Sequence, residues 1–155
     1  QFENVVMTRT YSKVFGLAAV RLGWAYCPAH VADVLNRVRN PFNVTSPAQA
    51  AGIAAVGDLS HTDAAVAHND EWLPRFTADL QGLGLEVAPS VGNFVLVRFG
   101  EAARAQSAYD HLLSRGVITR MMGGYGLPDG LRVTIGLESE LKAVIDGLAE
   151  HRKLA

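Results

Sequence analysis

The spacing of apolar residues changes after Gly84, and this change does most to limit the folds open to the chain. Before it, Leu73, Phe76 and Leu80 recur at the three- to four-residue spacing of one helix face. After it, short apolar runs alternate with helical patterns. We expect strands at 93–99, 117–121 and 131–135, and helices around 105–113 and 141–148. This order predicts an α+β domain in which helices cover a sheet.

The first forty residues carry another arrangement. Apolar runs at 5–7 and 20–26 predict two buried strands, and Pro28 suits the first position of a following helix. These features are typical of the tail of an α/β unit. Because Gln1 lies so close to an apolar strand, we expect the chain to be a piece of a longer protein.

Helix starts can be predicted between these two parts. Ser46 can cap a helix, Pro47 suits its first position, and Gln49 can complete a capping box. Ser60 and Asp63 predict a second cap. The helix that begins near Ser46 is rich in alanine and glycine, so another backbone can approach it closely.

Composition limits the partners and the compartment. The formal net charge of −1 over 155 residues gives no electrostatic reason to bind nucleic acid or an anionic membrane. No run of about 18 apolar residues is present, so we expect no membrane span. The lone Cys27 cannot form a disulfide within the chain, which favours a reducing cytoplasm.

The segment 8–23 contains the residues best suited to chemistry. Lys13 lies in a polar stretch beside the hydroxyls of Thr10 and Ser12, and Arg21 follows eight residues later. Arginine forms charge-assisted, often bidentate hydrogen bonds with phosphate, and a deprotonated lysine amine is a nucleophile. Taken alone, the same residues also fit a solvated surface loop.

This segment resembles the lysine segment of class I/II aminotransferases of fold type I. The matching residues are Thr10-Tyr11-Ser12-Lys13, Gly16-Leu17-Ala18 and Arg21-Leu22-Gly23. The resemblance implies that Lys13 is the catalytic residue and forms a Schiff base with pyridoxal 5'-phosphate (PLP). It also implies that Thr10, Ser12 and Arg21 hold the phosphate of this cofactor.

Three further segments, 40–51, 90–97 and 123–136, are similar to segments of histidinol-phosphate aminotransferases. The resemblance implies that Arg132 binds the substrate's α-carboxylate or its counterpart, and that Arg120 contacts the substrate's phosphate. One departure is clear. That family has Arg-Pro-Met before its glycine loop, whereas this chain has Arg120-Met121-Met122.

The resemblance also implies an organisation. We expect residues 1–40 to be the tail of the large PLP-binding domain, 41–84 connecting helices, and 85–155 the α+β small domain. The intact enzyme would be a homodimer that transfers an amino group between histidinol phosphate, or a similar amino acid or amino-alcohol phosphate, and 2-oxoglutarate. The family's aspartate for the pyridine nitrogen lies upstream, so we expect the chain alone to be inactive.

Several alternatives remain at this point. An aromatic or broad-specificity aminotransferase, or a PLP-dependent decarboxylase of the same fold, would share Lys13 and the phosphate site. A non-catalytic, aminotransferase-like binding module is a third reading. No metal site is expected, because His61 and His68 lie seven residues apart without a third ligand at metal spacing.

Overall fold

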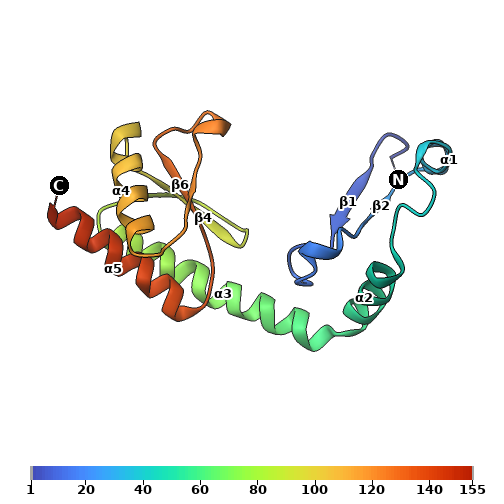
Figure 1. Ribbon diagram of the computed structural model, residues 1–155, viewed down its shortest axis with the longest axis horizontal. Helices are drawn as coiled ribbons and strands as arrows, with labels where there is room; N and C mark the ends of the chain where they lie inside the picture. The colour runs from blue at the N-terminus through green and yellow to red at the C-terminus, as the bar shows by residue number, and fades with distance from the viewer. Residues whose placement is uncertain (1, 155) are drawn as a thin grey trace. The chain divides into compact units, whose positions relative to one another are not determined.

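A computed structural model gives the structure of residues 2–154. The chain forms two compact units, Gln1–Val66 and Ala67–Ala155, each of which mixes helices and strands (Figure 1). None of the described helices is both long and apolar enough to cross a membrane. The elements of the first unit are β1 (Met7–Thr10), η1 (Ala18–Val20), β2 (Gly23–Tyr26), α1 (Ala29–Val38), α2 (Ser46–Gly57) and the first part of α3 (Leu59–Gly82).

In the first unit, β1 and β2 form an antiparallel pair in which Thr10 lies opposite Gly23. A Cβ atom on Gly23 would lie 2.8 Å from the carbonyl oxygen of Arg9, so glycine is needed for this close pairing. The predicted buried strand at 5–7 is wrong in place and in burial. The strand begins at Met7, and every residue of β1 is exposed. The second predicted buried strand, at 20–26, begins at Gly23 and is likewise exposed throughout.

The start of α2 differs by one residue from the prediction. Thr45, not Ser46, is the N-cap, because its side-chain oxygen accepts a hydrogen bond of 3.3 Å from the backbone N–H of Ala48. The Gln49 amide donates to the carbonyl of Val44 at 3.2 Å, so no capping box closes. The predicted helix itself is confirmed.

The second predicted cap is also displaced. The carboxylate of Asp58 accepts hydrogen bonds from the backbone N–H of His61 at 3.1 Å and from the hydroxyl of Ser60 at 2.8 Å. These two bonds, that of His61 foremost, hold the pKa of Asp58 below its usual range. Asp58 therefore caps the first turn of α3, and Ser60 is its partner rather than the cap. Pro74 lies inside α3, which continues through it.

The second unit consists of a four-stranded antiparallel sheet with helices on one face. The strand order is β3-β4-β6-β5. The strands expected at 93–99 and 131–135 and both helices are confirmed, the strand expected at 117–121 is shorter and comprises only Arg120–Met121, and β3 is an addition. Besides the end of α3, the elements are β3 (Glu86–Ala88), β4 (Phe94–Arg98), α4 (Ala102–Ser114), β5 (Arg120–Met121), η2 (Gly123–Tyr125), β6 (Gly130–Thr134) and α5 (Glu138–Leu154).

The core of this unit lies between the sheet and its helices. Val95 of β4 pairs with Val133 of β6, and both side chains are buried. They belong to one cluster with Phe76 and Leu80 of α3 and with apolar residues of α4 and α5. Phe76 is 1% exposed and Leu80 is fully buried. The end of α3 is therefore part of this core.

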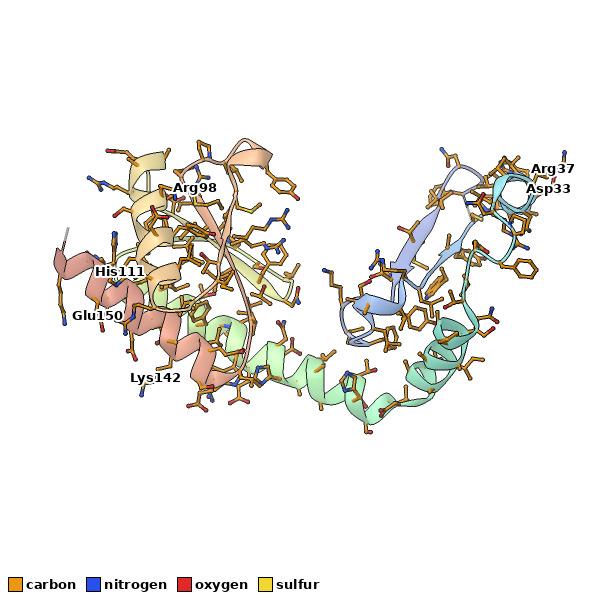
Figure 2. All side chains as sticks on the ribbon, in the orientation of Figure 1. Asp33, Arg37, Arg98, His111, Lys142 and Glu150 are labelled. Carbon is orange, nitrogen blue, oxygen red and sulfur yellow. The ribbon has the colours of Figure 1, made fainter. Side chains whose placement is uncertain are left out.

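The opposite face of the sheet carries the alternate residues of each strand, since neighbouring residues of a strand point to opposite faces. Arg132 of β6 lies between two buried neighbours and faces this open side. Where β4 ends and β6 begins, Arg98 (Figure 2) donates two hydrogen bonds of 2.8 Å to the carboxylate of Asp129. The Arg98 guanidinium holds the pKa of Asp129 below its usual range.

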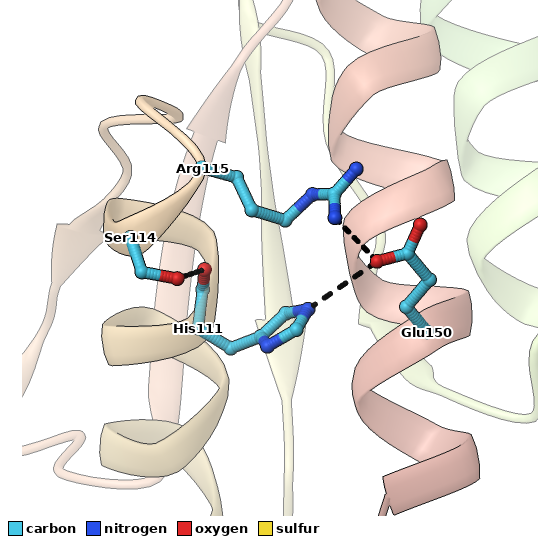
Figure 3. A network of polar contacts seen from close by, with 4 residues as sticks. All are labelled: His111, Ser114, Arg115 and Glu150. Atoms are coloured by element: carbon cyan, nitrogen blue, oxygen red, sulfur yellow. Dashed lines mark hydrogen bonds and ion pairs between the residues drawn. The ribbon is translucent and has the colours of Figure 1, made fainter.

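A polar network joins the helices α4 and α5. Their backbones are close, since a Cβ on Gly147 would lie 2.7 Å from the side chain of Leu112. Figure 3 shows Arg115 donating to the carboxylate of Glu150, with the ring of His111 3.9 Å from the same oxygen.

A pH effect on stability follows from His151 of α5. Burial, and then the nearby His111, lower the pKa of His151, whose ring is 2.9 Å from the hydroxyl of Ser107. The unfolded chain therefore binds more protons, and stability should fall as pH drops below the ordinary histidine value of about 6.5. Urea unfolding at about pH 7 and about pH 5 measures this loss. It should shrink in His151→Gln, and an equal loss in that variant would contradict the assignment.

Candidate functional site

The loop between β1 and β2 carries Lys13 and is closed at its neck. The backbone N–H of Tyr11 donates to the carbonyl of Leu22 at 3.0 Å, and that of Leu17 donates to the carbonyl of Tyr11 at 2.9 Å. Within the loop, Gly16 donates to the carbonyl of Lys13 at 2.8 Å. Gly16 has a φ of +67°, a conformation that favours glycine. Lys13 therefore begins a tight turn inside a hydrogen-bonded loop.

The loop rests on the small-residue helix α2. Gly52 of α2 is buried, and a Cβ there would overlap the side chain of Leu22 and lie 3.8 Å from the ring of Tyr11. The sequence predicted that another backbone approaches this helix closely, whereas the atoms found against Gly52 are side-chain atoms of Leu22 and Tyr11. The helix thereby fixes both ends of the loop that carries Lys13.

Arg21 has an unusual backbone conformation. Its φ of 54° and ψ of 50° are left-handed, which disfavours a residue with a side chain by about 1–2 kcal/mol. Its guanidinium donates a hydrogen bond of 2.7 Å to the carbonyl of Ala18. Left-handed non-glycine residues are frequent at functional sites, where the surrounding structure holds them in place.

The four residues predicted for the cofactor lie at one end of the hairpin. Thr10 ends β1, Ser12 and Lys13 follow it, and Arg21 precedes β2. Ser12 is partly buried and the other three are exposed. Within residues 2–154, no hydrogen bond joins any two of these four side chains. The fold thus places them on one short loop without joining them to one another.

The chemistry of this cluster suits a phosphate that also bears a carbonyl carbon. It offers two hydroxyls, a guanidinium and a primary amine, all of which can donate to phosphate oxygens. The sequence has no Asp or Glu between Glu3 and Asp33, so no carboxylate of this stretch competes for the cations. The residues present therefore fit PLP.

A second cluster lies on the open face of the sheet in the other unit. Arg120 of β5 pairs directly with Arg132 of β6, so both side chains leave the same face. Like charges opposite each other in a sheet are destabilising. The Nε of Arg132 is buried and has no hydrogen-bond partner among the described residues. A groove of about 650 Å³ runs beside both arginines. The pair is suited to an anionic ligand.

Aromatic rings lie beside both guanidinium groups. The Cζ of Arg132 lies 5.3 Å from the ring centre of Phe94, and that of Arg120 lies 5.3 Å from the ring centre of Tyr125. Neither aromatic residue was predicted from the sequence to be part of a site. Phe94 could have been found only from the register of β4 against β6, where it lies diagonal to Arg132.

No part of the described chain brings three or more His, Cys, Asp or Glu residues together as a metal site. His61 lies beside the lysine loop, since its ring would be 3.9 Å from a Cβ on Gly16. His68 instead forms a hydrogen bond of 2.9 Å with the carbonyl of Gly136. The two histidines therefore have different neighbours, although they are seven residues apart in the sequence.

Comparison with known proteins identifies relatives over the whole chain. The chain is 53% identical, over 99% of its length, to histidinol-phosphate aminotransferase of Rhodospirillum centenum. It is 54% identical, over 96% of its length, to that of Paramagnetospirillum magneticum. The chain spans only 42% and 41% of these two relatives. It therefore corresponds to about two fifths of a relative's length.

A solved structure extends this likeness to three dimensions. The histidinol-phosphate aminotransferase of Sinorhizobium meliloti, in complex with pyridoxal-5'-phosphate, superposes with a TM-score of 0.84 at 32% identity. The match covers 99% of this chain and 42% of that one. The expected partial fold of a fold-type I aminotransferase is confirmed. The family profile of aminotransferase class I and II matches residues 2–148, and the chain therefore belongs to this family.

Proposed function

We propose that this chain carries the cofactor lysine and part of the substrate site of a PLP-dependent aminotransferase. The observation that carries the proposal is the closed loop that presents Lys13 together with Thr10, Ser12 and Arg21. The names of the relatives support histidinol phosphate, or a similar amino acid or amino-alcohol phosphate, as amino donor. 2-Oxoglutarate is the proposed acceptor, and histidine biosynthesis the proposed setting.

Each residue of the loop has a proposed task. When bound, PLP supplies an aldehyde that condenses with amines and a ring that withdraws electrons from the substrate's α-carbon. Lys13 would hold the cofactor through its Nζ and would move a proton at the substrate's α-carbon. Thr10 and Ser12 donate their hydroxyl hydrogens to the phosphate, and Arg21 adds charge-assisted hydrogen bonds.

The arginine pair has the proposed task of binding substrate. Arg132 binds a carboxylate or its counterpart, and Arg120 binds the phosphate of the amino donor. The unpartnered Nε of Arg132 and the like charge opposite it support this assignment. An anion between the two guanidinium groups would relieve their repulsion and satisfy that buried donor.

The proposal extends to the domains and the assembly of the whole enzyme, and membership of the aminotransferase family supports it. We propose a cytoplasmic homodimer, with residues 1–40 in the large domain, 41–84 as connecting helices and 85–155 as the small domain. We also propose that the chain alone does not transaminate, because about two fifths of a relative's length supplies only part of such a site.

The proposal predicts selective labelling of one lysine. The chain has three, Lys13, Lys142 and Lys153, so each can be followed separately. After PLP is added and reduced with borohydride, we expect the stable adduct mainly on Lys13. All three lysines are exposed, but only Lys13 has neighbours that would hold the phosphate, whereas Lys142 and Lys153 lie on α5. Peptide mass spectrometry at limiting PLP measures the label on each.

The matched control is Lys13→Ala, in which labelling should fall to the background seen on the other two lysines. Equal labelling of all three lysines in the unaltered chain, or total labelling unchanged by Lys13→Ala, would refute the proposed role of Lys13. Phosphate should compete with PLP at Lys13 alone, since only that site binds through the phosphate group.

A further inference from the structure

The glycine loop between β5 and β6 contains an aromatic residue that contacts the proposed substrate site. We infer that Tyr125 is a positioning residue, which holds the Arg120 guanidinium ready for the phosphate of the substrate. The inference rests on the proposed function, because it requires that Arg120 binds an anion. It adds a residue that the sequence motif did not identify.

Two contacts join Tyr125 to Arg120. An Nη2 hydrogen of Arg120 is donated to the phenol oxygen at 3.0 Å, and the guanidinium carbon lies 5.3 Å from the ring centre. The contact uses one of the five N–H donors of the guanidinium and leaves the others for a ligand. Because the phenol is neutral, it holds the cation in place without neutralising its charge.

The backbone of the glycine loop holds Tyr125 firmly. Its N–H donates to the carbonyl of Met122 at 2.9 Å, and that of Leu127 donates to the same carbonyl at 3.2 Å. Gly126, with a φ of +76°, closes the turn through a hydrogen bond of 3.0 Å to Gly123. This left-handed position favours glycine. The ring is therefore attached to a closed turn rather than to a loose loop.

Arg120 has two reasons to need such a contact. Its side chain is exposed, so it would otherwise sample many rotamers that a ligand must fix on binding. It also lies directly opposite Arg132, whose like charge favours rotamers that point away. Loss of the phenol oxygen should therefore weaken phosphate binding by about 3- to 10-fold, the effect of one immobilised side chain.

The experiment measures binding of phosphoethanolamine to the purified chain by NMR titration. The variants are Tyr125→Phe, which keeps the ring and loses the acceptor, and Arg120→Ala. Tyr109→Phe is the matched control, since it removes a phenol oxygen from α4 in the same unit. We expect weaker binding only in the first two variants. The Arg120 Nε–H signal should also show greater mobility in Tyr125→Phe.

A double variant separates positioning from a general structural role. If Tyr125 acts through Arg120, adding Tyr125→Phe to Arg120→Ala should have no further effect. No binding by the unaltered chain, or none of the expected loss in Arg120→Ala, would refute the phosphate role of Arg120 and the inference with it. Binding that depends on Arg120 but is equal in Tyr125→Phe and Tyr109→Phe would overturn the role of Tyr125 alone.

Discussion

Replacing Phe76 with alanine should destabilise the second unit by about 3–5 kcal/mol. The ring is 1% exposed and belongs to the cluster that joins α3 to the sheet, so its removal leaves a cavity among side chains that cannot close in fully. Native domains have a net stability of about 5–15 kcal/mol. The substitution would therefore remove much of the free energy of unfolding. Urea unfolding followed by circular dichroism measures this loss.

Gln81→Ala is the matched control, because Gln81 is exposed on the same helix and its side chain has no partner among the described residues. Its effect should lie within about 0.5 kcal/mol. Amide exchange should become faster in β4 and β6 of the Phe76 variant and remain unchanged in the control. A loss below about 1 kcal/mol would show that α3 does not complete this core.

The regular elements of the second unit could be predicted because each has a clear period. The strand around 131–135 and the helix from 141 have apolar residues at spacings that only one kind of element explains. Strand β3 was not predicted, because Glu86–Ala88 is too short to show the alternation of apolar and polar residues that indicates a strand. Its existence depends on the pairing of Val87 with Val97, which is a contact between segments.

The errors at helix starts have a different origin. Threonine and serine are both favoured at the N-cap, and serine is ranked slightly ahead, so residue type alone does not select Thr45. The choice falls to the residue whose oxygen reaches a free backbone N–H, here that of Ala48. Likewise, apolar residues at 5–7 indicate a strand, but burial depends on a covering layer that local sequence does not specify.

The residues of the candidate site also fall into two groups, those that a local motif predicts and those that depend on contacts between distant segments. Lys13, Thr10, Ser12 and Arg21 were predicted from a local motif, and their shared loop follows from chain proximity. The pairing of Arg120 with Arg132 depends on the register set by the glycine loop, which residue types alone do not determine. Tyr125 was missed for that reason. The left-handed backbone of Arg21 was also unpredicted, since arginine has no preference for it.

Arg21→Gly should shift stability and cofactor affinity in opposite directions. Glycine removes a left-handed strain of about 1–2 kcal/mol, which stabilises the folded chain. Its greater freedom in the unfolded chain destabilises the folded chain by about 0.5–1 kcal/mol. Stability should therefore hold or rise by up to about 1.5 kcal/mol. Loss of the guanidinium removes charge-assisted hydrogen bonds to phosphate, so PLP affinity should fall about 10- to 100-fold. Urea unfolding and labelling of Lys13 across a PLP titration measure the two effects.

Phe42 provides a control that isolates the backbone effect. It has a φ of 55° like that of Arg21, and its side chain is 96% exposed. Phe42→Gly should give a similar stability change while labelling of Lys13 is unaltered. If both variants weaken labelling alike, the effect comes from the backbone of this unit and not from the guanidinium. If only Arg21→Gly weakens labelling, the role of the strained backbone at Arg21 is to bring its guanidinium to the cofactor's phosphate.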